Sequence, residues 1–171
     1  MNKNNYIAVA KKSASIQINE LKKIKKIFNK SFIKAVDLIL NSKGKVILAG
    51  IGKSGLIARK ISATFSSVGI PSFFCDPAQA LHGDMGQIEK GDILLIISYS
   101  GNTSELNNML RYANRYRIKI IGVASRPDSI LLKASDIKLL LPKVKESDVT
   151  GMVPTSSTSI TLLLGDTLAT T

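Results

Sequence analysis

Two patterns of apolar residues divide the chain near residue 44. Between Ile16 and Leu40, apolar residues recur at helical spacing with lysines between them, which predicts one amphipathic helix. Ser42, Lys43 and Gly44 are expected to end that helix. Beyond them come short, β-rich apolar runs, each followed by a Gly- or Ser-rich turn and a helical stretch. The runs cover residues 46–49, 71–75, 93–97, 118–124 and 137–141.

Most of these runs are apolar throughout, which is typical of strands in a parallel sheet that helices cover on both faces. Helices are expected at about 54–68, 103–116 and 129–134, and from Pro154 onward. The fold prediction is therefore an α/β protein, a three-layer α/β/α sandwich around a five-stranded parallel sheet. No repeat or Pro-rich linker divides it, so residues 1–171 are expected to form a single domain, with residues 1–43 as an N-terminal helical segment containing a long helix.

The net charge of +12 is concentrated at the start of the chain. Residues 1–45 hold 11 of the 24 lysines and arginines but only two acids, Glu20 and Asp37, so this stretch carries +9 and the rest +3. No basic stripe interleaved with aromatic residues follows, so we expect no nucleic-acid partner. A solvated, lysine-rich helix face explains the charge.

Composition also limits where the protein is expected to be found and which metal or disulfide sites it can form. No apolar run reaches the ~20 residues that span a bilayer, and residues 1–14 lack the pattern of a secretory signal, so we expect a cytoplasmic protein with no membrane contact. Cys75 and His82 are the only residues of their types. This excludes a disulfide within the chain and a Cys/His metal cluster. We expect no metal and no cofactor.

Two loops that are candidates for ligand binding each follow a predicted buried strand. The first is Gly-Ile-Gly-Lys-Ser-Gly at 50–55, and the second is Ser-Tyr-Ser-Gly-Asn-Thr-Ser-Glu at 98–105. In doubly wound sheets, ligands bind beyond the carboxyl ends of the strands, where the strand order reverses. If the order is 2-1-3-4-5, the two loops face one crevice.

The second loop carries more hydroxyl groups than a helix cap needs. Ser98, Ser100, Thr103 and Ser104 precede a predicted helix, whose free N–H groups can join them around an anion. One hydroxyl is enough for an N-cap, so the four favour a phosphate cradle. The Thr-Ser-Ser-Thr cluster at 155–158 opens the last helix and has the same two interpretations.

Two better-known glycine-rich motifs, the P-loop and the dinucleotide-binding motif, must be compared with the first loop. A P-loop requires glycine at the position of Ile47, so nucleotide hydrolysis is disfavoured. Gly50, Gly52 and Gly55 do fit G-x-G-x-x-G, and Asp76 follows at the distance expected of a dinucleotide site. However, Asp76 followed by proline is also a good N-cap, and that motif gives the hydroxyl-rich loop no role.

Together these segments resemble the sugar-isomerase (SIS) domain, and within it the arabinose 5-phosphate isomerases that supply synthesis of the lipopolysaccharide sugar acid KDO. The matching segments, in the family's order, are 52–55 (Gly-Lys-Ser-Gly), 80–86 (Ala-Leu-His-Gly-Asp-Met-Gly), 98–105, 125–127 (Ser-Arg-Pro), 153–158 and 165–166 (Gly-Asp). The resemblance implies a flavodoxin-like strand order 2-1-3-4-5 and a homotetramer whose active sites are shared between subunits. It also implies an enzyme that interconverts D-ribulose 5-phosphate and D-arabinose 5-phosphate.

The resemblance also implies particular site residues. The family's functional positions correspond here to Lys53, His82, Glu105 and Glu146. Residues around the phosphorylated sugar are expected to be Gly52, Ser54, Ser98, Ser100, Gly101, Thr103, Ser104, Thr155, Ser156 and Ser157.

An aldose–ketose exchange needs a base beside the carbonyl and a donor for the enediolate that forms. Glu105 or Glu146 suits the base if burial raises its pKa, Lys53 suits the stabilising cation or a sugar ligand, and His82 suits proton transfer between oxygens or ring opening. The alternatives are a helix-terminus carboxylate for Glu105, a loop charge for Glu146, a solvated Lys53 and a packed loop histidine for His82.

Members of this family usually continue past the last helix into a Ser-His-Pro-Gly-Gly segment, whose histidine lies at the active site, and then into paired cystathionine-β-synthase-type regulatory domains. The printed sequence has neither, and its last residues are still apolar at Leu164 and Leu168. We therefore expect a chain cut within a helix, without regulatory domains, that binds substrate but turns it over weakly or not at all.

Three other functions stay open from sequence. A non-catalytic sugar-phosphate regulator has the same fold, although the residues before Lys45 offer one long helix rather than a helix-turn-helix. An isomerase for another ketose phosphate is the second. A dinucleotide binder is the third.

Overall fold

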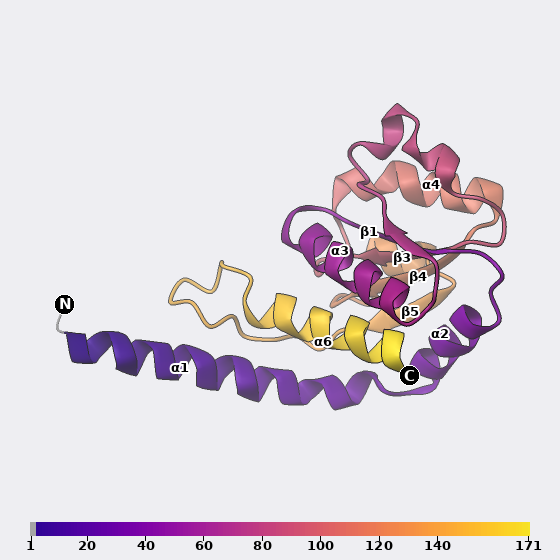
Figure 1. Cartoon of the computed structure of the whole chain (residues 1–171). Helices are drawn as coiled ribbons and strands as arrows, with labels where there is room; N and C mark the ends of the chain where they lie inside the picture. Colours follow the sequence, from indigo (N-terminus) through magenta and orange to yellow (C-terminus); the bar gives the residue numbers. More distant parts are fainter. Residues whose placement is uncertain (1–2) are drawn as a thin grey trace.

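A five-stranded parallel sheet forms the centre of the fold in the computed structural model, which describes residues 3–171 (Figure 1). Its strands are β1 (Val46–Gly50), β2 (Ser72–Phe74), β3 (Ile93–Ile97), β4 (Lys119–Ala124) and β5 (Ile137–Leu140). The spatial order is β2-β1-β3-β4-β5, and every pairing is parallel, with Val46 opposite Ile93 and Ile93 opposite Lys119. The predicted sheet and its strand order are confirmed.

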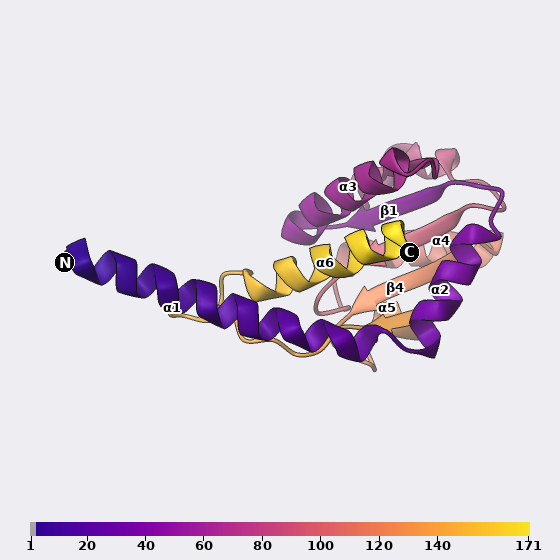
Figure 2. The same cartoon turned by 60° about the horizontal axis from the view of Figure 1, so that its bottom comes forward.

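Helices cover both faces of this sheet. The α-helices are α1 (Lys3–Leu21), α2 (Lys30–Leu40), α3 (Gly52–Ser67), α4 (Asn107–Tyr116), α5 (Ile130–Ala134) and α6 (Ser156–Thr170). Short 3₁₀ helices are η1 (Lys22–Ile27), η2 (Ala80–His82), η3 (Asp84–Gln87) and η4 (Ser104–Leu106). Helices α2, α3 and α6 pack on one face, and α4 and α5 on the other (Figures 1 and 2). The three-layer sandwich is therefore present as predicted.

The alternation of side chains along each strand divides the core into two clusters. Val46 and Leu48 of β1 point toward α3 and α6, whereas Ile47 and Ala49 belong to the cluster under α4 and α5. All five residues of β1 and all five of β3 are buried. Burial on both faces explains why these runs are apolar throughout rather than alternating.

The predicted continuous helix between Ile16 and Leu40 is wrong in one respect. A long N-terminal helix is present as α1, but the chain breaks at Phe28, whose backbone (φ −75°, ψ 77°) leaves the helical region, and α2 starts after Asn29. The Asn29 side chain accepts a hydrogen bond from the Ser31 amide at 2.8 Å, which is an N-cap. The break turns α2 back onto the sheet, so that Ile27 and Phe32 are both buried.

Helices α3 and α6 approach each other closely on one face of the sheet. A Cβ at Gly165 of α6 would overlap the Ile61 side chain of α3, so the small residue sets their separation. Lys60 and Asp166 add an ion pair of 2.5 Å between the two helices.

Within residues 3–171, no helix combines the length and apolar character needed to cross a bilayer.

Candidate functional site

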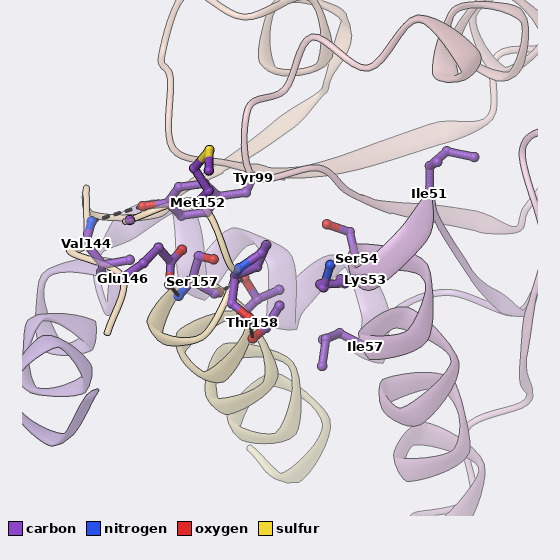
Figure 3. A pocket seen from close by; sticks show the side chains of 13 residues that line it. Ile51, Lys53, Ser54, Ile57, Tyr99, Val144, Glu146, Met152, Ser157 and Thr158 are labelled. Carbon is purple, nitrogen blue, oxygen red and sulfur yellow. Dashed lines mark hydrogen bonds between the residues drawn. The ribbon is translucent and has the colours of Figure 1, made fainter. Parts of the chain in front are cut away.

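A pocket of about 510 Å³ lies where β1 and β3 end against α3 and α6 (Figure 3). This is the point in the sheet where the strand order reverses, as expected for ligand sites in doubly wound folds. Figure 3 shows Lys53, Ser54 and Ile57 of α3 facing the Tyr99 and Glu146 side across the opening, with α6 below. The lining residues are Ile51, Lys53, Ser54, Ile57, Tyr99, Val144, Glu146, Gly151, Met152, Pro154, Ser157, Thr158 and Thr161.

Glu146 caps the first turn of α6. Its Oε2 accepts hydrogen bonds from the Thr155 amide at 2.7 Å, the Thr155 hydroxyl at 2.9 Å and the Ser157 amide at 3.3 Å. Burial by itself raises the pKa of Glu146, but the hydrogen bonds from Ser157 and Thr155 outweigh it and hold that pKa below 4.5. Glu146 is therefore an ionised carboxylate at neutral pH, and the raised pKa considered for it is not found.

Lys53 and Ser54 lie in the first turn of α3. No side chain caps this helix at Ile51, and Lys53 forms no ion pair within residues 3–171. The free N–H groups of the first turn and the lysine together make this side of the pocket favourable for negative charge. Gly52 starts the helix with a φ of +58°, a conformation that glycine adopts readily.

Tyr99 is a pocket residue that the sequence reasoning did not single out. Its hydroxyl accepts a hydrogen bond from the Val144 amide at 2.9 Å and donates to the Pro142 carbonyl at 3.4 Å. It therefore ties the loop after β3 to the loop after β5, which carries Glu146. A lone aromatic residue in a hydroxyl-rich loop was the available signal.

The hydroxyls of the 98–104 loop are mostly bonded to their own loop. Ser98 Oγ lies 2.8 Å from Thr103 Oγ1 and also accepts from the Gly101 amide at 3.0 Å. Ser104 Oγ donates to the Glu105 carboxylate at 2.8 Å. Gly101 has a φ of +69°, and a Cβ there would overlap Ser129. The loop is thus preformed beside the pocket, and only its Tyr99 lines it.

Ser100 faces a neighbouring groove. That groove, of about 450 Å³, shares Tyr99 and Val144 with the pocket and also contains Arg126 and Lys143. On the α6 side, Thr155 hydrogen-bonds with Glu146, and Ser157 lines the pocket.

Ser156 lies deeper than its two neighbours. It is fully buried, and its Oγ has no hydrogen-bond partner among residues 3–171.

His82 and Glu105 lie outside the pocket in a single copy of the chain. His82 ends the η2 turn and is exposed, and Glu105 is exposed on η4. The pKa of Glu105 lies below its usual 4.5 because its own backbone amide and the Ser104 hydroxyl bond the carboxylate. The structure therefore brings Lys53 and Glu146 together but not the other two predicted catalytic residues.

The glycine-rich loop has a second hollow on its other side. Gly50, Gly52, Gly55 and Asp76 all line a groove of about 610 Å³, as a dinucleotide site would require. Asp76, however, accepts a hydrogen bond from the Ala78 amide at 2.9 Å and caps the following turn. This hydrogen bond within the turn explains the presence of an aspartate at position 76 without a bound ribose.

Residues 38–171 match the family model described as the SIS domain. The chain belongs to the SIS domain family. Among its relatives, the arabinose 5-phosphate isomerase KdsD of Pseudomonas aeruginosa is 46% identical over 138 residues, which are 81% of this chain and 42% of the relative. The same enzyme of Francisella tularensis is 44% identical over 157 residues, or 90% of this chain and 48% of the relative. This SIS domain chain spans about half the length of the curated relatives it matches.

A solved structure extends the similarity to the whole fold. E. coli CFT073 c3406, in complex with arabinose 5-phosphate, is 32% identical and matches with a TM-score of 0.95. The match covers 99% of this chain and 90% of that chain. The N-terminal helices that precede the SIS domain match at residue 38 are therefore part of the shared architecture.

Proposed function

We propose that this SIS domain is an aldose–ketose isomerase that interconverts D-arabinose 5-phosphate and D-ribulose 5-phosphate, supplying KDO synthesis in the cytoplasm. The observation that carries the proposal is that Lys53 and the ionised Glu146 line the same pocket at the β1–β3 switch point. The relatives' names and the arabinose 5-phosphate complex of the similar structure support the substrate. The pocket volume of about 510 Å³ is within the usual range for small-molecule sites.

Each side chain has a task that its position suits. The Glu146 carboxylate takes the proton from the hydroxyl-bearing carbon beside the carbonyl and returns it to the former carbonyl carbon, while the hydroxyl proton passes to the former carbonyl oxygen. Lys53 and the first amides of α3 stabilise the negative charge of the enediolate between these steps. The reaction is redox-neutral overall, so no external oxidant or reductant enters.

The phosphate group is proposed to lie against the 98–104 loop and the start of α6. Hydroxyls of Ser98, Ser100, Thr103 and Ser104, with the Gly101 amide, would exchange their present loop contacts for phosphate oxygens. Ser54 and the 155–157 segment complete the proposed shell around the sugar phosphate.

Ligand binding is expected to raise the melting temperature of the chain. D-arabinose 5-phosphate should produce a larger shift than inorganic phosphate or NAD at equal concentration, because only it fills both the phosphate and the sugar parts of the site. A ligand at about 100 times its Kd stabilises the native state by about 2.7 kcal/mol. A shift with NAD alone would overturn the sugar-phosphate proposal, and binding without turnover would favour a regulatory domain.

We further propose that His82 and Glu105 act in a homotetramer, where exposed residues of one copy reach the pocket of another. A mixture of Lys53→Ala and His82→Ala chains, unfolded and refolded together, should then recover activity that neither variant has alone. Recovery requires that the two residues of one site come from different copies. A monomeric mass in sedimentation, or a mixture as inactive as its parts, would contradict the shared site.

A further inference from the structure

The segment that carries Glu146 has no regular secondary structure of its own. Residues 141–146 form neither helix nor strand, and turns and bends follow up to residue 153. A loop without ladder hydrogen bonds is held in place mainly by contacts with other elements. The position of the Glu146 carboxylate therefore depends on what this loop touches.

One such contact is with α1 on the C-terminal side of Glu146. The Ser147 Oγ accepts hydrogen bonds from Ser13 Oγ at 2.9 Å and from Gln17 Nε2 at 3.2 Å. The Ser147 amide in turn donates to Thr155 Oγ1 at 2.9 Å, and this hydroxyl donates to Glu146 Oε2. Helix α1 is thus joined to the Glu146 carboxylate through two residues.

A second contact holds the N-terminal side. The Glu20 carboxylate accepts a hydrogen bond from the Lys145 amide at 3.1 Å and pairs with Lys23 at 2.5 Å. Lys23 also donates to the Lys143 carbonyl at 3.4 Å. The Glu20 side chain is only 14% exposed, and hydrogen bonds from Lys23 and Lys145 keep its pKa below 4.5.

The spacing of these residues explains how one helix reaches both sides. Ser13, Gln17 and Glu20 are four and three residues apart, so they lie on one face of α1. The loop between β5 and α6 runs along α1 in both views (Figures 1 and 2). This face of α1 is polar because it contacts the backbone amide of Lys145 and the hydroxyl of Ser147 rather than the apolar core.

We propose that Gln17 and Glu20 are positioning residues for Glu146, and that α1 sets the geometry of the pocket without touching the substrate. The proposal rests on the proposed function, in which Glu146 moves the substrate proton. A misplacement of about 1 Å costs about 100-fold in rate, so even a small shift of the loop lowers turnover.

Glu20→Ala and Gln17→Ala are the informative variants. Each is expected to lower kcat about tenfold with little change in KM, since the phosphate and Lys53 side of the pocket stays intact. Glu20→Gln keeps an oxygen for the Lys145 amide and should recover most of the lost kcat. In a Glu146→Ala background, Glu20→Ala should have no further effect on kcat, because the group that it positions is gone.

A matched control separates positioning from general stability. Glu89→Ala removes an exposed carboxylate that forms no hydrogen bond or ion pair through its side chain within residues 3–171, and should leave kcat unchanged. If Glu20→Ala lowers the melting temperature but leaves kcat unchanged, the contact between Glu20 and the Glu146 loop stabilises the fold without positioning Glu146. An equal loss of kcat with and without Glu146 would also overturn the proposal.

Amide hydrogen exchange gives a readout that does not need turnover. Glu20→Ala should speed exchange in residues 143–147, where the Lys145 amide loses its acceptor, and leave β1 and β3 unchanged. Unchanged exchange in 143–147 would overturn the positioning role. An inactive wild-type chain with this exchange pattern would instead refute the isomerase proposal and keep the contact between α1 and the Glu146 loop.

Discussion

Replacing Lys53 with alanine is expected to lower kcat/KM for D-arabinose 5-phosphate by about 100-fold to 1000-fold, the usual effect of removing one group that stabilises an oxyanion. Lys53 lies in the uncapped first turn of α3 and has no ion-pair partner within residues 3–171. Its charge is therefore available to the enediolate. The measurement is a steady-state assay that detects the ketose formed.

The control for this variant is Lys90→Ala. Lys90 is exposed and lines none of the hollows described above, so its loss changes the net charge equally without touching the pocket. If the only effect were a weaker electrostatic attraction for the phosphate, kcat/KM would fall by the same small factor in both variants. Wild-type turnover in Lys53→Ala would remove Lys53 from the proposed mechanism.

Glu146→Gln is expected to lower kcat by about 100-fold to 10,000-fold, because an amide can accept a hydrogen bond but cannot take a proton from carbon. Its oxygen can still accept the hydrogen bonds from Thr155 and Ser157, so the fold should be little affected. Glu89→Gln, an exposed change of the same kind, should keep wild-type turnover. Equal activity in the two variants would show that Glu146 only caps α6.

Glu146→Ala should in addition lower the free energy of unfolding by about 1–2 kcal/mol, as the loss of a helix cap does. The folded-state pKa of Glu146 is below its usual 4.5, so its stabilising contribution is complete above pH 4.5 and is lost as the pH falls through the folded pKa. The difference between wild-type and variant in the free energy of unfolding, measured by denaturation, should therefore be smaller near pH 3 than at pH 7. A difference independent of pH would argue against the charged cap.

The chain from residue 45 onward was more predictable than the N-terminal segment before it. Five apolar runs and their glycine- and serine-rich turns were enough to place the sheet, because a strand buried on both faces leaves a continuous apolar run. The break at Phe28 and Asn29 was missed because helical spacing continues across it. Only packing against the sheet decides that α2 turns back there.

The sequence names candidate residues for the site, but only the structure shows which of them lie together. Lys53, Glu146, Ser54 and Ser157 all line one pocket, and their roles there stay a prediction. Tyr99 was overlooked as a site residue, since its part in joining two loops depends on where β5 ends. The condition set for a carboxylate base, a pKa raised by burial, fails for Glu146 because hydrogen bonds from Ser157 and Thr155 at the start of α6 outweigh the effect of burial.

By itself the sequence determined the α/β class, because apolar runs and turn residues are local properties. The strand order came from the family resemblance, and the residues proposed for isomerase chemistry stay a prediction. The tertiary structure decided which of those residues meet, and that α1 holds the loop carrying Glu146. Such contacts join positions more than 120 residues apart, such as Glu20 with Lys145 and Ser13 with Ser147. No local pattern encodes them, because a hydrogen-bond partner is set by how the elements pack in space.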